Sequence, residues 1–294
     1  MSILSTLKII SSHPLNKKNK FKSILRFIGW QINTKLNPYP IIYSFTEKSK
    51  LIIKKGMTGA TGNLYCGLHE YEDMSFLLHF LRREDFFVDI GANVGSYTVL
   101  ASGHAGAKTI SIEPVPSTFG YLMDNININR ITDRVTALNA AIGSEKGFVN
   151  FTKSLDAMNH VACENENDDI IKVPVEVLDD ILSGRETPAL IKIDVEGFET
   201  NVVKGACSTL KKDGLKAIII ELNGMGARYG YDEKDIHDTL MNLGFKPFLY
   251  NPVKRELTLA DSYGAFNTIY IRDVSYVEDR VKNAPEVRIK NSKI

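Results

Sequence analysis

Apolar residues recur at helical spacing near the start of the chain. Phe21, Leu25, Ile28 and Ile32 are three or four positions apart, which places them on one face of a helix. Lysines and an arginine lie among them, so the pattern predicts a basic amphipathic helix. Residues 33–65 combine prolines and glycines with two short β-prone runs, which predicts turns and a small hairpin.

A different pattern begins after a helical segment at residues 71–81. Short apolar runs alternate with helical segments almost to the end of the chain, which is typical of a parallel sheet flanked by helices. We therefore predict an α/β, Rossmann-like domain with a seven-stranded, mostly parallel sheet and helices on both faces. The predicted strands are residues 86–90, 109–113, 135–139, 189–194, 217–222, 245–250 and 266–271.

These patterns divide the chain into three parts. We expect an N-terminal helical and hairpin extension at residues 1–70, a main domain at 71–275, and a polar C-terminal tail at 276–294. Because residues 281–294 are mostly polar and charged, we expect that segment to fray.

An insertion interrupts the main domain at residues 147–172. It contains a predicted strand at 147–152 and a polar, acidic stretch at 164–169. Insertions near the edge of a sheet often carry functional residues, so we expect this one to cover or shape a pocket.

Composition excludes several classes of protein. The 36 basic and 35 acidic residues leave a net charge of +1, so no overall charge attracts nucleic acid. Cys66, Cys163 and Cys207 lie far apart, which argues against a disulfide framework and a structural zinc site. No apolar run reaches the roughly 18 residues that span a bilayer, and no secretory signal is recognised. We expect a soluble, cytoplasmic protein.

The charge is unevenly distributed. Residues 1–55 contain eleven basic side chains and a single acid, Glu47. The amphipathic helix in this segment has two interpretations: it lies on an anionic membrane surface, or it packs its apolar face on the main domain. The sequence favours packing and keeps peripheral membrane contact as the alternative. It predicts no oligomeric state.

The strongest motif is a strand that runs into an acid and a glycine-bearing turn. Asp89 lies near the end of the first strand, and Gly91 and Gly95 follow it before a predicted helix. Glycines let the backbone turn sharply and approach a ligand closely. A dinucleotide site would have glycine at the position of Asn93, where the chain touches a pyrophosphate. S-adenosyl-L-methionine (SAM) has an ammonium group and no pyrophosphate, so Asp89 suits it better than it suits NAD.

Two further segments support a nucleoside ligand. Glu113 ends the next strand, 22 residues after Gly91, close to the ~20-residue spacing at which an acid accepts ribose hydroxyls. The segment 138–142 follows the third strand and is where we expect the adenine to lie.

These motifs closely resemble, in order, those of the FkbM-type methyltransferase family. The resemblance covers roughly residues 65–272, and the longest shared stretch is IKIDVEGFE at 191–199. The other shared stretches are VDIGANVGSYT (88–98), ISIEP (110–114), LMDNININ (122–129), LNAAIG (138–143), VLDDIL (177–182) and IIIELN (218–223).

The resemblance implies a SAM-dependent methyltransferase on a class I, Rossmann-like fold. It implies that Asp89, Gly91, Asn93 and Gly95 bind SAM, with Glu113 on the ribose and with the methyl donor facing Asp194 and Glu196. Members of this family are mostly O-methyltransferases of sugars, glycolipids or polyketide-type metabolites. The chain departs from many SAM enzymes at Asn139 and Ala141, where an acid often binds the adenine amine. We expect recognition there through the backbone or Asn139.

Methyl transfer to a hydroxyl requires a group that removes the proton. Asp194 and Glu196 follow the fourth strand, whose carboxyl end faces the ligand crevice, so they are the candidate bases. They could instead cap the following helix. Glu199 and Glu221 are candidate contacts to the acceptor. His160, in the insertion, is another candidate base, although a lone loop histidine is often simply solvated.

The leading prediction is a SAM-dependent O-methyltransferase acting on a hydroxyl of a sugar, glycan or related small molecule. Asp179 and Asp180 are interpreted as a helix start, and we predict no metal. One competing hypothesis is a nicotinamide-dependent oxidoreductase on the same fold. The other is a non-catalytic binding protein in glycan assembly.

Overall fold

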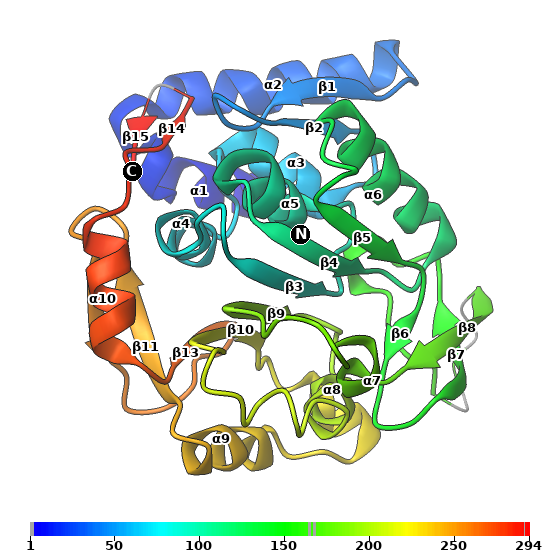
Figure 1. Ribbon diagram of the computed structural model, residues 1–294. Helices are drawn as coiled ribbons and strands as arrows, with labels where there is room; N and C mark the ends of the chain where they lie inside the picture. Colours follow the sequence, from blue (N-terminus) through cyan, green and yellow to red (C-terminus); the bar gives the residue numbers. More distant parts are fainter. Residues whose placement is uncertain (1–2, 164–165, 167–168, 291) are drawn as a thin grey trace.

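A large twisted sheet forms the centre of the molecule (Figure 1). The computed structural model describes residues 3–163, 166, 169–290 and 292–294. In this part of the chain the largest sheet has eight strands in the order β12-β11-β13-β10-β9-β3-β4-β5. The strands are β3 (Phe86–Ile90), β4 (Lys108–Ile112), β5 (Val135–Leu138), β9 (Leu190–Ile193), β10 (Ala217–Glu221), β11 (Lys246–Asn251), β12 (Glu256–Leu259) and β13 (Asn267–Ile271).

The pairing confirms the predicted α/β class with a mostly parallel sheet. Strands β5, β4, β3, β9 and β10 pair in parallel, and β13 pairs antiparallel with both β10 and β11. The prediction of seven strands was wrong by one, because β12 joins the edge of the sheet beside β11. Most β12 side chains are exposed, so no buried apolar run marks this strand in the sequence.

Helices cover both faces of the sheet, as predicted (Figure 1). The central strands are buried on both sides, which explains why they are mostly apolar rather than alternating, with Asp89 in β3 and Lys192 in β9 as polar exceptions. One face packs on α4 (Tyr71–Phe80) and α10 (Val274–Lys282), and the other on α7 (Leu178–Ile181), α8 (Glu199–Lys204) and α9 (Glu233–Asn242). The remaining helical segments of the main domain are α5 (Ser96–Thr98), η2 (Val99–Ala105), α6 (Pro116–Ile128) and η4 (Met225–Tyr229).

The N-terminal extension contains more helix than the sequence suggested. The predicted hairpin is confirmed as β1 (Ile41–Ser44) and β2 (Lys50–Ile53). Helix α3 (Thr58–Cys66) was wrongly expected to be turns. Its glycines lower helix propensity, but Gly62 packs so tightly that a Cβ there would lie 2.5 Å from the His69 ring, so tertiary contact outweighs propensity. The extension also has α1 (Ile3–Ser12), η1 (Pro14–Asn19) and α2 (Lys20–Leu36).

Helix α2 confirms the predicted amphipathic helix but not the favoured packing of its apolar face. Its buried side is formed by Ser23, Phe27 and Trp30. The predicted apolar face is exposed instead, with Phe21 at 71% and Ile32 at 54% exposure. In the described part of the chain, no helix is both long and apolar enough to cross a bilayer.

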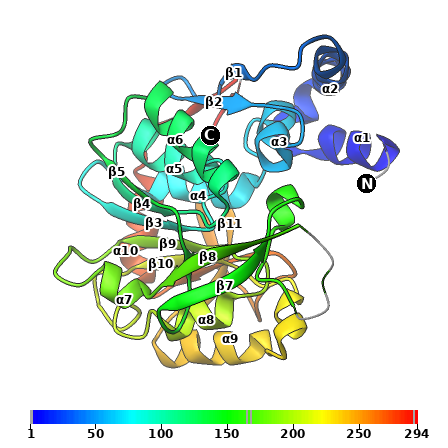
Figure 2. The same cartoon turned by 90° about the vertical axis from the view of Figure 1, so that its right-hand side faces the viewer.

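The insertion and the short strand that precedes it form a small sheet beside the main one (Figure 2). Strands β6 (Ala141–Ile142), β8 (Ile170–Glu176) and β7 (Gly147–Thr152) pair in that order, and η3 (Asp156–Met158) follows β7. Of the predicted polar stretch at 164–169, residues 164, 165, 167 and 168 lie outside the described residues.

The C-terminal segment does not fray as expected. After α10, strands β14 (Arg288–Ile289) and β15 (Ser292–Lys293) form a hairpin. Val287, Ile289 and Ile294 are buried in the same core as α1 and α4. The expectation was wrong because a few apolar side chains among many charged ones are enough to dock a short hairpin.

Candidate active site

A cavity of about 220 Å³ opens at the carboxyl ends of β3, β4, β9 and β10. In an open parallel sheet, this edge is where ligands bind. Helix α3 contributes Thr58, Gly59 and Asn63 to the wall. The insertion contributes Phe151 and Asn159, as expected for a segment that shapes a pocket.

Asp89 lies at the floor of the cavity, near the end of β3. Its side chain is 1% exposed, and Oδ2 accepts a hydrogen bond of 2.7 Å from the Thr98 hydroxyl. The Ser111 hydroxyl supports Thr98 at 2.6 Å. Oδ1 is buried and has no partner in the described structure. Burial raises the pKa of Asp89 to about 6, with Lys192 acting in the opposite direction.

The glycine loop after Asp89 passes tightly against the loop after β9. Gly91 has φ +77°, and a Cβ there would come within 1.8 Å of the Asp194 carbonyl oxygen. Asn93 has φ +51°, a left-handed conformation in which asparagine is tolerated. Both residues line the cavity, whereas Gly95 does not. The lack of a side chain at Gly95 makes room for Leu122, and its expected contact with the cofactor stays a prediction.

Glu113 lies beside the glycine loop and faces the cavity. Its Oε2 accepts a hydrogen bond from the Asn93 N–H at 3.0 Å, and Oε1 accepts one from the Val115 N–H at 2.9 Å. Each oxygen keeps a second lone pair for a ligand. Burial raises the pKa of Glu113 to about 7, although the two N–H donors lower it.

The segment after β5 forms an apolar wall. Ala140, Ala141 and Ile142 line the cavity together with Phe151. The expectation that Asn139 contacts adenine is corrected. Its Nδ2 donates to the carbonyl oxygens of Glu113 and Pro114, at 2.8 and 3.0 Å, and its side chain lies outside the cavity wall.

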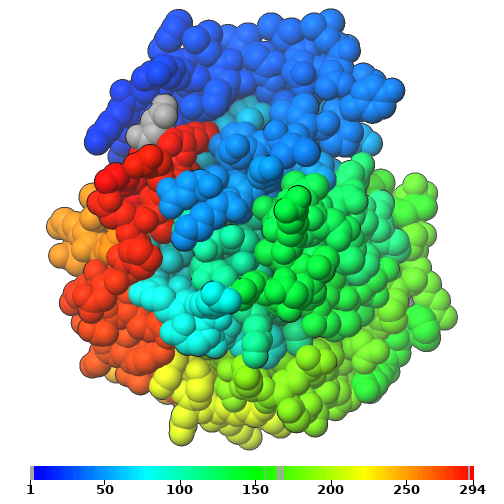
Figure 3. Space-filling model, turned by 45° about the horizontal axis from the view of Figure 1, so that its top comes forward, coloured from blue at the N-terminus to red at the C-terminus, as the bar shows by residue number. Residues whose placement is uncertain are grey.

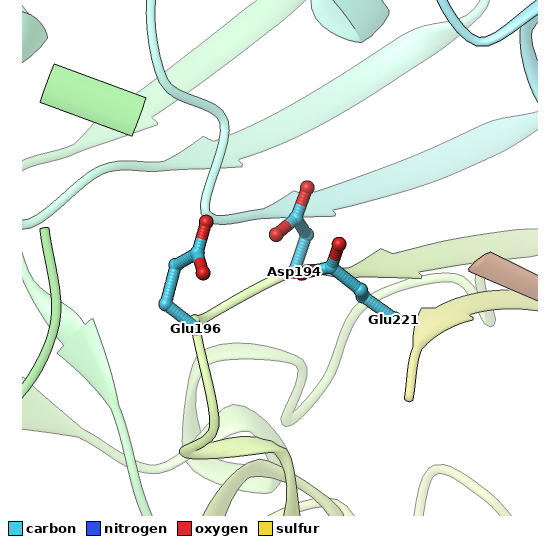
Figure 4. A group of neighbouring side chains, drawn as sticks. All are labelled: Asp194, Glu196 and Glu221. Carbon is cyan, nitrogen blue, oxygen red and sulfur yellow. The ribbon is translucent and has the colours of Figure 1, made fainter. Parts of the chain in front are cut away.

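Three carboxyl groups gather at another part of the cavity. Asp194 and Glu196 follow β9, and Glu221 ends β10. One oxygen from each lies within 4.8 Å of the others, and Figure 4 shows the three groups turned to the same side. Glu196 has φ +55°, a left-handed and strained conformation of a kind that clusters at functional sites.

Crowding of these acids changes their proton affinity. Burial raises the pKa of Glu196 to about 7, and the charges of Asp194 and Glu199 add to the effect. Burial also raises the pKa of Glu221 to about 9, helped by Asp194 and Glu196. Near neutral pH, Glu221 therefore holds a proton while Glu196 exchanges one readily.

Lys192 is a site residue that the sequence reasoning gave no role. It is 3% exposed, its Nζ lies 2.6 Å from Asp194 Oδ2, and it lies 4.7 Å from the centre of the Tyr97 ring. Burial alone would lower the pKa of Lys192, but the charges of Asp194, Glu70 and Asp89 outweigh burial and raise it. A lysine within an otherwise apolar strand was the available signal, because such a lysine needs buried acidic partners.

Glu199 does not face the acceptor region, contrary to expectation. It is 2% exposed and is absent from the cavity wall. Its Oε1 accepts hydrogen bonds of 3.1 Å from the N–H groups of Val195 and Gly197. Glu199 therefore braces the loop that presents Glu196.

His160 is also corrected as a candidate base. Its ring is buried beside the cavity rather than in its wall. Nδ1 donates to the Met158 carbonyl oxygen at 2.8 Å, and Nε2 lies 2.7 Å from Glu166 Oε1. Both ring nitrogens face acceptor oxygens, so neither is free to take a proton from a substrate. The pair with Glu166 ties the insertion together.

The spacing of the acid group is relevant to metal binding, although the sequence predicts no metal. Asp194, Glu196 and Glu221 could hold a divalent cation by their spacing, but the Lys192 ammonium already neutralises Asp194. Asp179 belongs to a helix start as interpreted, and accepts hydrogen bonds from Ser208 and Thr209. The absence of a metal stays a prediction.

The chain matches a known protein family over the part that forms this site. The model of the methyltransferase FkbM domain matches residues 89–247, which is more than half of the chain. The chain belongs to the FkbM methyltransferase family. The match includes the glycine loop, Glu113 and the acid group, and apart from Val88 it contains all the motifs that carried the resemblance in the sequence.

Individual relatives of this FkbM domain are distant. The chain is 28% identical over 170 residues to the hexuronic acid methyltransferase AglP of Haloferax volcanii, covering 57% of this chain and 66% of that protein. It is 28% identical over 154 residues to the methyltransferase sdnD of Sordaria araneosa, covering 41% of this chain and 60% of that protein. It thus spans just under two thirds of these relatives' length.

A solved structure of an FkbM methyltransferase, from Methylobacillus flagellatus, is also similar. It is 18% identical, with a TM-score of 0.45, and the match covers 78% of this chain and 57% of that one.

Proposed function

We propose that this chain is a SAM-dependent O-methyltransferase that acts on a hydroxyl of a sugar or related small molecule. One observation carries the proposal: a single cavity joins an unpartnered buried oxygen of Asp89 to the group of three acids. The Asp89 oxygen is suited to bind a ligand ammonium, and the three acids are suited to a hydroxyl that loses a proton.

The residues present fit SAM. The free Oδ1 of Asp89 would accept a hydrogen bond from the SAM ammonium, and Glu113 has lone pairs left for the two ribose hydroxyls. The apolar wall at Ala141 suits the adenine. When bound, SAM supplies a methyl group activated by its attachment to a positively charged sulfur.

The acid group would then bind the acceptor substrate and remove its hydroxyl proton. Glu196, ionised, accepts the hydroxyl proton, because its pKa near 7 suits a general base at neutral pH. The protonated carboxyl group of Glu221 can donate a hydrogen bond to an oxygen of the methyl-acceptor substrate. Lys192 fixes Asp194 and limits the negative charge beside Glu196.

The charge of the cavity narrows the class of acceptor. AglP is described as acting on a hexuronic acid, which supports a sugar acceptor for this chain. However, the ionised Glu196 would repel an acceptor carboxylate placed beside it, and the acid group offers such a carboxylate no free cation because Lys192 is paired with Asp194. We therefore propose a hydroxyl on a neutral or amino-bearing part of the acceptor.

The first test is ligand binding by calorimetry, with S-adenosylhomocysteine (SAH) as the probe. We expect binding, and we expect Asp89→Asn and Glu113→Gln each to weaken it by about 1–3 kcal/mol, the cost of losing a charged hydrogen bond. The exposed Glu186→Gln is the matched control. Absence of SAH binding, or NADH binding in its place, would contradict the proposal and favour an oxidoreductase.

The second test is methyl transfer. Labelled SAM is incubated with the protein and separate panels of neutral sugars, amino sugars and uronic acids. We expect transfer to neutral or amino sugars. SAH binding without transfer to any panel, together with unchanged glycans in cells lacking the protein, would instead favour the non-catalytic binding protein.

A further inference from the structure

We infer that the outer face of α2 docks on an anionic phospholipid bilayer. The inference starts from an apolar stripe that the fold leaves uncovered. Exposed fractions on this helix are 71% for Phe21, 49% for Leu25, 45% for Ile28, 54% for Ile32 and 80% for Leu36. At 100° per residue these positions fall within one narrow sector of the helix. We call these five residues the α2 stripe.

The opposite side of α2 holds the helix on the protein. Phe27 packs edge-on against Tyr65 of α3, with ring centres 5.3 Å apart, and Trp30 is buried beside it. Arg26 donates hydrogen bonds to Asn16 and to the Tyr65 carbonyl oxygen at 2.6 and 2.7 Å. The α2 stripe therefore faces outward because the other side of the helix is already engaged.

Charge complementarity identifies the partner. Residues 3–36 contain seven basic side chains and no acid. Six of the seven are exposed lysines, namely Lys8, Lys17, Lys18, Lys20, Lys22 and Lys35. Within the described residues, none of these six forms an ion pair with an acid. An apolar stripe bordered by unpaired lysines matches the interface of an anionic membrane. A second copy of this chain would bring two sets of lysines together, so we favour lipid over self-association.

The position of α2 makes this face accessible. The N-terminal helices form a ridge along one side of the molecule, drawn in dark blue in Figures 1 and 3. Helix α1 packs beside α2 and adds three exposed apolar residues, Ile3, Leu4 and Ile9. Beneath α2, helix α3 forms part of the cavity wall. Docking through α2 would thus leave one helix between the bilayer and the cavity.

The experiment is flotation of the full chain with vesicles of phosphatidylcholine alone or mixed in equal parts with phosphatidylglycerol. We expect binding to the mixed vesicles, weakened by salt. The paired change Leu25→Glu and Ile32→Glu should reduce binding at least about tenfold, because two apolar groups no longer enter the interface. Lys20→Glu with Lys22→Glu should reduce it by a similar factor.

Matched controls separate the α2 stripe from general surface effects. Leu249→Glu with Val253→Glu changes two apolar residues that are 65% and 80% exposed on another part of the surface. Lys211→Glu with Lys246→Glu makes the same charge change elsewhere. Both pairs should float like the unchanged chain, and all variants should keep their melting temperature and SAH affinity.

Two results would overturn the inference. One is flotation that is equal for the α2 variants and their controls. The other is no flotation, with ultracentrifugation showing a dimer that Leu25→Glu and Ile32→Glu dissociate. Because SAH binding is read separately, failure of docking leaves the proposed methyltransferase function untouched.

Discussion

At the scale of single residues, Glu196 has the surroundings of a general base. We expect Glu196→Gln to lower kcat by about 10²–10⁴-fold, the usual contribution of such a group, with SAH affinity unchanged. A base works in its ionised form, so activity of the unchanged chain should rise as pH increases through about 7, the raised pKa of Glu196. Initial rates across pH test this, with Glu186→Gln as the control. An unaltered rate in Glu196→Gln would remove this residue from the chemistry.

Glu221 should affect stability in a pH-dependent way. Its folded-state pKa is raised from 4.5 to about 9, so its favourable contribution is complete below 4.5 and is lost as pH rises toward 9. Glu221→Gln has no ionisable group there, and should gain stability relative to the unchanged chain over this range. We expect a gain of about 1–3 kcal/mol near neutral pH. Urea unfolding at several pH values measures it, and a difference independent of pH would contradict the assignment.

The sequence located most of the cavity residues but not how they are used. Asp89, Glu113, Glu196 and Glu221 could be placed in the cavity because each lies at or just after the carboxyl end of a strand, at the same edge of the sheet. Glu199 could not be separated from them, because whether a side chain turns to the cavity or to its own loop depends on local backbone geometry. For His160, the decisive contact was with Glu166 in an irregular loop, which no periodicity predicts.

At the scale of elements, the site depends on two loops that touch. Gly91→Ala would place a methyl group 1.8 Å from the Asp194 carbonyl oxygen and force a left-handed φ on alanine. We expect a loss of about 2–4 kcal/mol in stability and weaker SAH binding, since both cavity loops must move. Gly120→Ala is the control, because a Cβ there meets nothing within 4 Å and α6 favours alanine. Equal effects of the two changes would show that the loop contact is unimportant.

Elements with strong periodicity were predictable, and those held by packing were not. Strands β3 and β10 are predominantly apolar, so the sequence located them within a residue or two. Helix α3 forms despite its glycines because of its contact with His69, and β12 pairs at an edge with exposed side chains. Both depend on neighbours that are distant in the sequence.

At the scale of the whole molecule, the two ends of the chain pack against each other. Ile289 is fully buried and contacts the core near Gly67, and Lys290 Nζ donates to the Leu64 carbonyl oxygen at 2.8 Å. The extension is also tied to the main domain by Asn125 of α6, whose Oδ1 accepts from the Ile52 N–H and whose Nδ2 donates to the Val94 carbonyl oxygen. The N-terminal extension and C-terminal hairpin are thus joined to the main domain by buried contacts.

This joint packing predicts a large effect from a small change near the C-terminus. Ile289→Ala removes buried atoms from the core that α1, α4 and the hairpin share, so we expect a loss of about 2–5 kcal/mol in the free energy of unfolding. Leu259→Ala, at a side chain 57% exposed on the sheet edge, should cost far less. Urea unfolding followed by circular dichroism compares the two. If the C-terminal segment were a frayed tail, Ile289→Ala would unfold at the same urea concentration as the unchanged chain. A single transition shifted to lower urea concentration would instead show that both ends unfold together with the sheet.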